Sequence, residues 1–196
     1  MESMDVINSV LEFGTDAVLR YRTMSEESDN RIQEYFLRSC IALDLHRRFA
    51  CCVQLEVLYT DIASYLRVPD SPELTQKFGG CKTDIAMFET GFAPAIIELK
   101  ILDEDRKLKG TEDDVLKIRQ LSEIRKIRGY IGVFICQTSG SLEEQIQRLE
   151  TVLNRKVYTG TSQRSHDAQW QWCFGCSLVS ENPRPDGVRF PCSPVT

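Results

Sequence analysis

The chain has 196 residues, a length that suits one domain with a single hydrophobic core. Its residues are 42% hydrophobic and 27% charged, which excludes a disordered segment, and no apolar run approaches the roughly 20 residues of a membrane span. The formal net charge of −5 argues against broad coating of nucleic acid, although it leaves room for an enzyme with a local basic groove. The acidic start lacks the basic region of a secretion signal, so we expect a cytoplasmic protein, or a nuclear one if the source is eukaryotic or viral.

The first third of the chain predicts two helices, one strand and a loop. Apolar residues recur at helical spacing over residues 6–19, with Gly14 as a candidate break, and again over residues 31 to about 49. Residues 53–59 alternate as a strand does, and residues 60–66 either continue that strand or form a short helix. A loop is expected where the next prolines and glycines gather: Pro69, Pro72, Gly79 and Gly80.

Two short apolar segments follow, and each predicts a largely buried strand. The first is Gly80–Phe88 and the second is Ala95–Leu102. The residues between them, 90–94, include the glycine and proline of a turn. The two strands are therefore expected to form an antiparallel hairpin.

Helices and strands alternate through the remainder. A helix is predicted over residues 111–128, with Asp114 at the capping-box position of its first turn. Residues 130–137 form a continuous apolar run typical of a buried strand. Ser141 caps a further helix, and residues 170–179 predict a final strand.

This order of elements predicts an α/β fold with a mixed central sheet and helices on its faces. We expect one domain over residues 1–180. The tail, residues 181–196, holds four of the seven prolines and is expected to be extended and loosely held.

The eight cysteines fall mostly within apolar helix or strand patterns, which predicts reduced, buried thiols in a chain without a secretion signal. Cys173 and Cys176 have the two-residue spacing of zinc and redox motifs. A tetrahedral zinc site needs four ligands, and only His166 and Cys192, at irregular spacing, could complete the set. Because the segment also resembles a strand, we expect these cysteines to be structural.

Charged residues interrupt the two central strands where a core would exclude them. Asp84 lies in the first strand, and Glu98 and Lys100 lie two positions apart in the second, so the latter two point to the same side. If the turn is centred between residues 91 and 92, Asp84 lies opposite Leu99 and diagonally near both Glu98 and Lys100. Two carboxylates can bind Mg²⁺ while a lysine orients or deprotonates water, or stabilises the transition state. The Glu-x-Lys pattern also occurs by chance on strands that only face solvent.

Asp84, followed fourteen residues later by Glu98-Leu99-Lys100, resembles the PD-(D/E)XK nuclease superfamily, the restriction-endonuclease-like fold. The resemblance covers about residues 30–137 and implies an αβββαβ core, although Thr83 stands where the motif name has proline. It implies that Asp84 and Glu98 bind Mg²⁺, or Mn²⁺, and that Lys100 acts on the hydrolytic water. Many members add a glutamate from the preceding helix. In this chain Glu34 is the best match, and Glu56 on the first strand is the second choice.

Basic residues flank this predicted site and could bind the phosphate backbone of a nucleic acid. Lys107 and Lys109 precede the helix that follows the hairpin. Lys117 and Gln120 lie on that helix, which often lines the site in the resembled family. Acidic residues are interspersed among them, so a solvated helix face explains the same charges.

Three hypotheses follow. The first is a Mg²⁺-dependent endo- or exonuclease, acting on DNA in preference to RNA and possible as a homodimer. The second is a catalytically inactive restriction-endonuclease-like domain that binds a protein or a nucleic acid. The third is a zinc- or thiol-dependent interaction module centred on Cys173 and Cys176.

Overall fold

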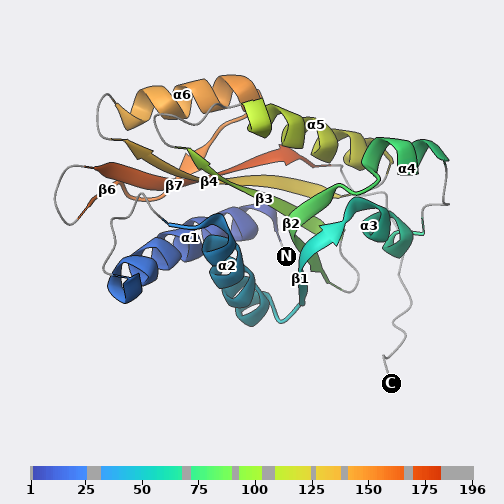
Figure 1. Ribbon diagram of the computed structural model, residues 1–196, viewed down its shortest axis with the longest axis horizontal. Helices are drawn as coiled ribbons and strands as arrows, with labels where there is room; N and C mark the ends of the chain where they lie inside the picture. Colours follow the sequence, from blue (N-terminus) through green and yellow to red (C-terminus); the bar gives the residue numbers. More distant parts are fainter. Residues whose placement is uncertain are drawn as a thin grey trace.

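The computed structural model describes residues 2–25, 32–67, 72–89, 93–102, 109–124, 127–137, 141–165 and 170–181. These residues form one seven-stranded mixed sheet with helices on both faces (Figure 1). The strands are β1 (Cys52–Leu58), β2 (Lys82–Phe88), β3 (Ala95–Leu102), β4 (Arg128–Gln137), β5 (Tyr158–Thr159), β6 (Gln163–Arg164) and β7 (Gln171–Ser180). The helices are α1 (Ser3–Ser25), α2 (Glu34–Phe49), α3 (Tyr59–Tyr65), α4 (Pro72–Phe78), α5 (Lys109–Ile124) and α6 (Leu142–Leu153).

The strand order is β1-β2-β3-β4-β7-β5, with β6 also pairing with β7. β3 and β4 pair in parallel, and the other strand pairs of the described sheet are antiparallel. The predicted α/β fold with a mixed, helix-flanked sheet is therefore confirmed. The order α2-β1-β2-β3-α5-β4 also follows the expected αβββαβ sequence of elements, with α3 and α4 between β1 and β2.

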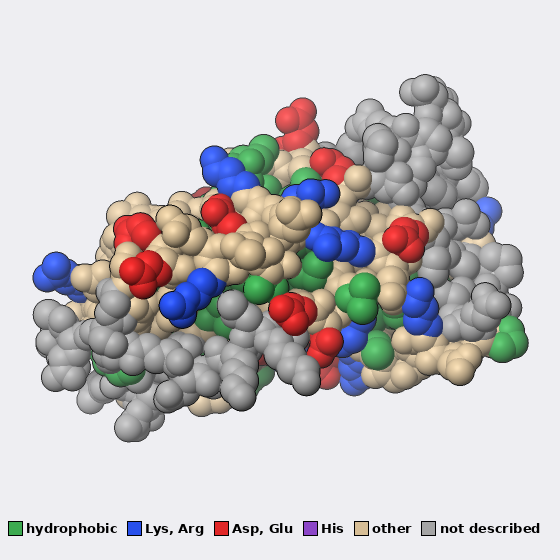
Figure 2. Space-filling view, turned by 90° about the horizontal axis from the view of Figure 1, so that it is seen from above, with side chains coloured by type: hydrophobic (Ala, Val, Ile, Leu, Met, Phe, Trp, Pro, Cys, Tyr) green, Lys and Arg blue, Asp and Glu red, His purple; other side chains and the backbone are tan. Residues whose placement is uncertain are grey.

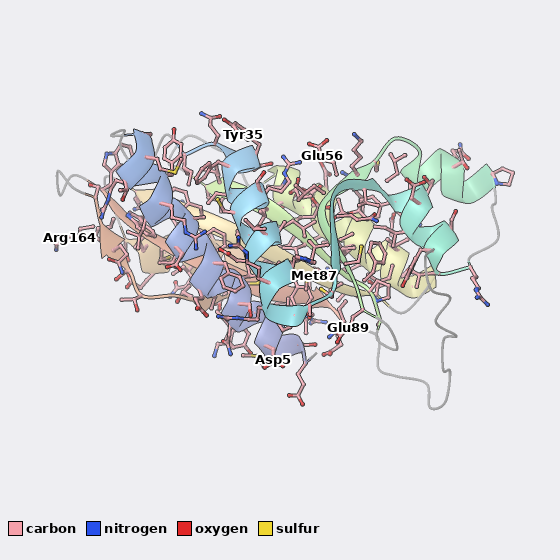
Figure 3. The ribbon with its side chains drawn as sticks, turned by 90° about the horizontal axis from the view of Figure 1, so that it is seen from below. Asp5, Tyr35, Glu56, Met87, Glu89 and Arg164 are labelled. Atoms are coloured by element: carbon pink, nitrogen blue, oxygen red, sulfur yellow. The ribbon has the colours of Figure 1, made fainter. Side chains whose placement is uncertain are left out.

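Two hydrophobic cores lie on opposite faces of the sheet because side chains alternate along each strand. Ile97 and Leu99 of β3 join the core beneath α1 and α2. Ile96 and Leu102 join the core beneath α3, α4, α5 and α6. Figures 1 and 3 show α1 and α2 together on one side of the sheet. Glu98 and Lys100 fall on the alternate positions of β3, so their side chains belong to the α5 side.

The predicted break at Gly14 was wrong, because α1 continues through this residue. A Cβ at Gly14 would lie 2.6 Å from ring atoms of Phe174 on β7. The glycine therefore permits close packing of the helix on the sheet, which a periodicity pattern does not reveal.

The predicted loop before β2 contains a helix. Pro72 opens α4, a position where its missing N–H costs no helical hydrogen bond. Gly80 follows the helix with φ of +78°, a left-handed conformation that glycine adopts without strain. The remaining loop residue, Pro69, lies outside the described residues.

The helix after the hairpin begins at Lys109 and ends at Ile124, so its predicted span of 111–128 was displaced at both ends. Ser141 caps α6 as expected, since its hydroxyl accepts a hydrogen bond from the Glu143 N–H. Among the helices that the structure describes, none has the length and apolarity needed to cross a membrane. The proline-rich part of the predicted tail, residues 182–196, lies outside the described residues.

Candidate functional site

Asp84 and Glu98 face each other where the pairing of β2 with β3 ends. The ladder covers Ile85↔Ile97 to Met87↔Ala95, and continuing it by one residue sets Asp84 across from Glu98. The predicted register, with Asp84 opposite Leu99, was therefore wrong by one residue. The Asp84 carboxylate accepts a hydrogen bond from the Leu99 N–H through Oδ2 at 2.7 Å. Asp84 lies near enough to Glu98 for its charge to act on the Glu98 carboxyl group.

Glu98 is buried, with 4% of its surface exposed. The phenol of Tyr59, the first residue of α3, donates a hydrogen bond to Glu98 Oε1 at 2.6 Å. Burial and, after it, the charge of Asp84 raise the pKa of Glu98 to about 8, although the Tyr59 hydrogen bond opposes the rise. Two facing carboxylates of which one is buried cannot both be ionised at low cost without a nearby cation.

Lys100 reaches an acid that the sequence interpretation assigned to helix capping. Its ammonium lies 2.6 Å from Oδ2 of Asp114 on α5, and Lys117 lies 3.1 Å from Oδ1 of the same carboxylate. Burial works to lower the pKa of Lys100, but the hydrogen bond to Asp114 and its charge outweigh that effect and raise it. Lys100 is therefore an ammonium at neutral pH. It can orient water or stabilise negative charge, but it is poorly suited to remove a proton.

Arg38 on α2 joins Asp84 to a further acid, Glu56 of β1. Its Nη1 lies 2.7 Å from Glu56 Oε1 and 3.4 Å from Asp84 Oδ1. Glu56 lies between the pairs Leu55↔Ile85 and Val57↔Thr83, at a left-handed backbone position where the regular pairing of β1 with β2 is interrupted. Arg38 therefore links an acid of β1 to an acid of β2. Figure 3 shows Glu56 at the same end of the molecule as Tyr35, near the start of α2.

Glu34, the preferred helix glutamate, is the first residue of α2 and is half-buried. Its charge contributes to the raised pKa of Lys100, so it lies close enough to act on the cluster. Glu56 is the acid that Arg38 links to Asp84. The ligand role of either glutamate stays a prediction.

The predicted nucleic-acid contacts have different outcomes. Lys117 lies beside the cluster through Asp114. Gln120 is half-buried one turn later on α5. Lys109 begins α5 without a described side chain, and Lys107 lies outside the described residues. Figure 2 shows acidic and basic side chains interspersed over the face that carries α5 and α6, with no single basic patch on its described part.

The part that Tyr59, Asp114 and Arg38 play in the cluster was not predicted from the sequence. Asp114 directly precedes Val115 and lies one turn before Ile118, both of which face the core. Arg38 lies one turn before the buried Ile41. A charged residue within an apolar helical stripe was the available signal, and it is the same signal that singled out Asp84 and Glu98 on the strands.

The two cysteines with zinc-like spacing cannot bind one ion together. Cys176 belongs to the core beneath α1 and α2, whereas Cys173 belongs to the core on the other face of β7. Burial raises the pKa of Cys173 to about 11 and raises that of Cys176 further. All seven described cysteines are free thiols. His166 and Cys192 lie outside the described residues.

The carboxylates of Asp84 and Glu98 are oxygen donors of the kind that Mg²⁺ prefers. Within the described ranges, no group of three or more histidine, cysteine, aspartate or glutamate side chains is arranged to hold a metal ion. Asp84 and Glu98 supply hard oxygen donors, and Mg²⁺ commonly uses one or two carboxylates with water and substrate phosphate as its other ligands. Two surface hollows, of about 380 and 220 Å³, are lined by residues of α1 and the end of α2 and lie away from this pair.

Comparisons with protein-family models, with curated proteins and with solved structures find no match to this chain.

Proposed function

We propose that the protein is a Mg²⁺-dependent nuclease, also active with Mn²⁺, that hydrolyses phosphodiester bonds of DNA or RNA. The observation that carries this proposal is the facing pair Asp84 and Glu98, with Lys100 on the same side of β3 as Glu98. Ionising a buried acid beside a second acid costs free energy unless a cation binds to the pair. The resemblance of these three residues to the PD-(D/E)XK pattern supports the same function.

Asp84 and Glu98 are the proposed metal ligands, with Glu34 as an additional one. A bound Mg²⁺ supplies Lewis-acid chemistry at the scissile phosphate and at water. Tyr59 orients Glu98 through the hydrogen bond to Oε1, and the Leu99 N–H orients Asp84 through Oδ2. These two hydrogen bonds restrain the side chains that would bind the ion.

Lys100 is proposed to act as a cation. Asp114 holds its ammonium at 2.6 Å, so the positive charge is fixed beside Glu98. A fixed ammonium stabilises the negative charge that accumulates on a phosphate during hydrolysis, and it can orient the attacking water. Asp114 is then a positioning residue, acting through Lys100.

The substrate is proposed to extend along α5. Lys117 and Gln120 are suitably placed for backbone phosphates, and Lys107 and Lys109 are proposed to extend that contact. DNA is the preferred expectation over RNA. A homodimer and a cytoplasmic or nuclear location remain part of the proposal.

A binding module without catalysis is the second candidate, and one observation favours it. Arg38 and Lys100 already neutralise acids of the cluster, so the fold does not require a metal ion for charge balance. Such a module would bind nucleic acid or protein with the same scaffold. Calorimetric titration with Mn²⁺ separates the candidates, because only the nuclease needs a metal site that depends on Asp84.

The decisive experiment is a cleavage assay with single-stranded DNA, double-stranded DNA and RNA in Mg²⁺ and in Mn²⁺. The parent is compared with Asp84→Asn, Glu98→Gln and Lys100→Gln. Lys156→Gln is the matched control, since Lys156 is exposed and adjoins β5 at the opposite edge of the sheet.

The proposal predicts that each of the three site variants loses at least roughly 100-fold in rate, as expected for losing a metal ligand or a fixed charge. Lys156→Gln should retain full activity. Cleavage that survives in all three site variants would remove these residues from the mechanism. Absence of cleavage together with absence of Mn²⁺ binding would favour the binding module.

A further inference from the structure

Arg38 of α2 is a largely buried arginine that contacts two acids of the cluster. A single nitrogen, Nη1, approaches both Glu56 and Asp84, and only 14% of the Arg38 side chain is exposed. The Nε group is buried and has no hydrogen-bond acceptor among the described residues. Burying a guanidinium with one donor unsatisfied is costly unless the charge is needed where it lies.

Glu56, the closer of the two acids that contact Arg38, has an unusual backbone conformation. Its backbone has φ of +52°, in the left-handed region that a non-glycine residue seldom adopts. Its carboxylate contacts Arg38 at 2.7 Å and Lys82 at 3.5 Å, yet 56% of its side chain is exposed. A strained, exposed acid therefore serves as a second acceptor for the guanidinium, next to Asp84.

The two contacts of Arg38 differ in strength. The distance to Glu56 is a short charge-assisted hydrogen bond, whereas the 3.4 Å distance to Asp84 Oδ1 is a looser ion pair. The other oxygen of Asp84 already accepts the Leu99 N–H. The oxygen that remains for a cation is thus the one that Arg38 approaches.

We propose that Arg38 is the internal counter-cation of Asp84, competing with a divalent cation for Oδ1 and held by Glu56 when the divalent cation binds. The proposal deepens and rests on the proposed function, because it assumes that Asp84 is a metal ligand. Two positive charges cannot share one carboxylate oxygen without repulsion, so the ion must displace the guanidinium. Glu56 lowers the cost of that displacement because it keeps the arginine paired.

Isothermal titration calorimetry with Mn²⁺ alone tests the proposal at 0.15 M KCl, and circular dichroism checks that each variant is folded. Arg38→Gln should bind Mn²⁺ roughly tenfold more tightly than the parent, since a competing charge is gone. Glu56→Gln should bind Mn²⁺ more weakly, about threefold, because Arg38 then relies on Asp84 alone. In the double variant the effect of Glu56→Gln should disappear.

Lys82→Gln is the matched control. Lys82 contacts Glu56 but not Asp84 among the described ion pairs, so its removal changes the local field without removing a competitor. Equal tightening by Lys82→Gln and Arg38→Gln would overturn the proposal, as would an unchanged or weaker Mn²⁺ affinity of Arg38→Gln. If Arg38→Gln does not fold, the exposed Glu56→Gln variant decides instead: weaker binding supports competition, and unchanged binding overturns it.

The outcomes also separate this inference from the proposed function. No Mn²⁺ binding by the parent, or binding that Asp84→Asn leaves unchanged, would remove both. Binding that depends on Asp84 but not on Arg38 would remove the inference and leave the nuclease proposal standing.

Discussion

Replacing Glu98 by glutamine should change how the stability of the protein depends on pH. Glutamine has the shape of glutamate and can still accept the Tyr59 hydrogen bond, but it carries no charge. Burial and the charge of Asp84 together raise the pKa of Glu98 to about 8 from the ordinary value of 4.5, so the native protein binds this proton more tightly than the unfolded chain does. Stability from this group is complete below pH 4.5 and is lost progressively as the pH rises to about 8.

The difference between those pKa values corresponds to at most about 5 kcal/mol of unfolding free energy. Because the charge of Asp84 is one of the causes, part of this energy belongs to the pair. We therefore expect the parent to lose about 2–4 kcal/mol more than Glu98→Gln between pH 4.5 and pH 8. The unfolding free energy of the parent should therefore fall relative to that of Glu98→Gln as the pH rises from 4.5 to 8.

Urea unfolding at a series of pH values, without divalent cations, measures this difference. Glu123→Gln is the matched control because Glu123 is an exposed glutamate on α5, and it should follow the parent. Parallel pH profiles for the parent and Glu98→Gln would refute the reasoning, as would a parent that gains stability relative to the variant as the pH rises to 8. Either result would mean that burial and the charge of Asp84 do not raise the pKa of Glu98 in the native protein.

Three further predictions concern packing, capping and thiol reactivity. Gly14→Ala should lower the unfolding free energy by about 1–2 kcal/mol, because the new methyl group would meet the Phe174 ring and outweigh the gain in helix propensity; urea unfolding that shows a more stable variant would contradict this. Ser141→Ala should cost about 1 kcal/mol through loss of the α6 cap, and an unchanged denaturation midpoint would exclude that role. In the native protein, iodoacetamide should modify the exposed Cys52 at least about tenfold faster than the buried Cys176, as measured by peptide mass spectrometry; equal rates would show that β7 opens readily.

The predictable parts of the structure are those that depend on local pattern. Alternation along the chain was enough to place Glu98 and Lys100 on one side of a strand, and the short turn was enough to pair that strand with its neighbour. The register of β2 with β3 could not be predicted in this way. It depends on packing and on the hydrogen bond that the Leu99 N–H donates to Asp84, and no sequence pattern encodes either of them.

The partners that come from helices could not be predicted in the same way. Asp114 satisfies a capping-box pattern, yet its carboxylate binds Lys100 because α5 begins earlier and crosses the end of β3. Arg38 and Glu56 are eighteen residues apart and meet only when α2 packs on the sheet. Side-chain contacts across layers depend on how helices are docked, and the chain order alone does not determine that docking.

The left-handed turn of the backbone at Glu56 has a second effect, on the outermost strand. β1 ends the described sheet on one side, and it carries the exposed apolar residue Leu55 immediately before Glu56. A straight, apolar edge strand is a template onto which another polypeptide can add as an extra strand. The kink and the charge at Glu56 interrupt this pattern in β1. Glu56, which also contacts Arg38, therefore disfavours self-association through this edge strand.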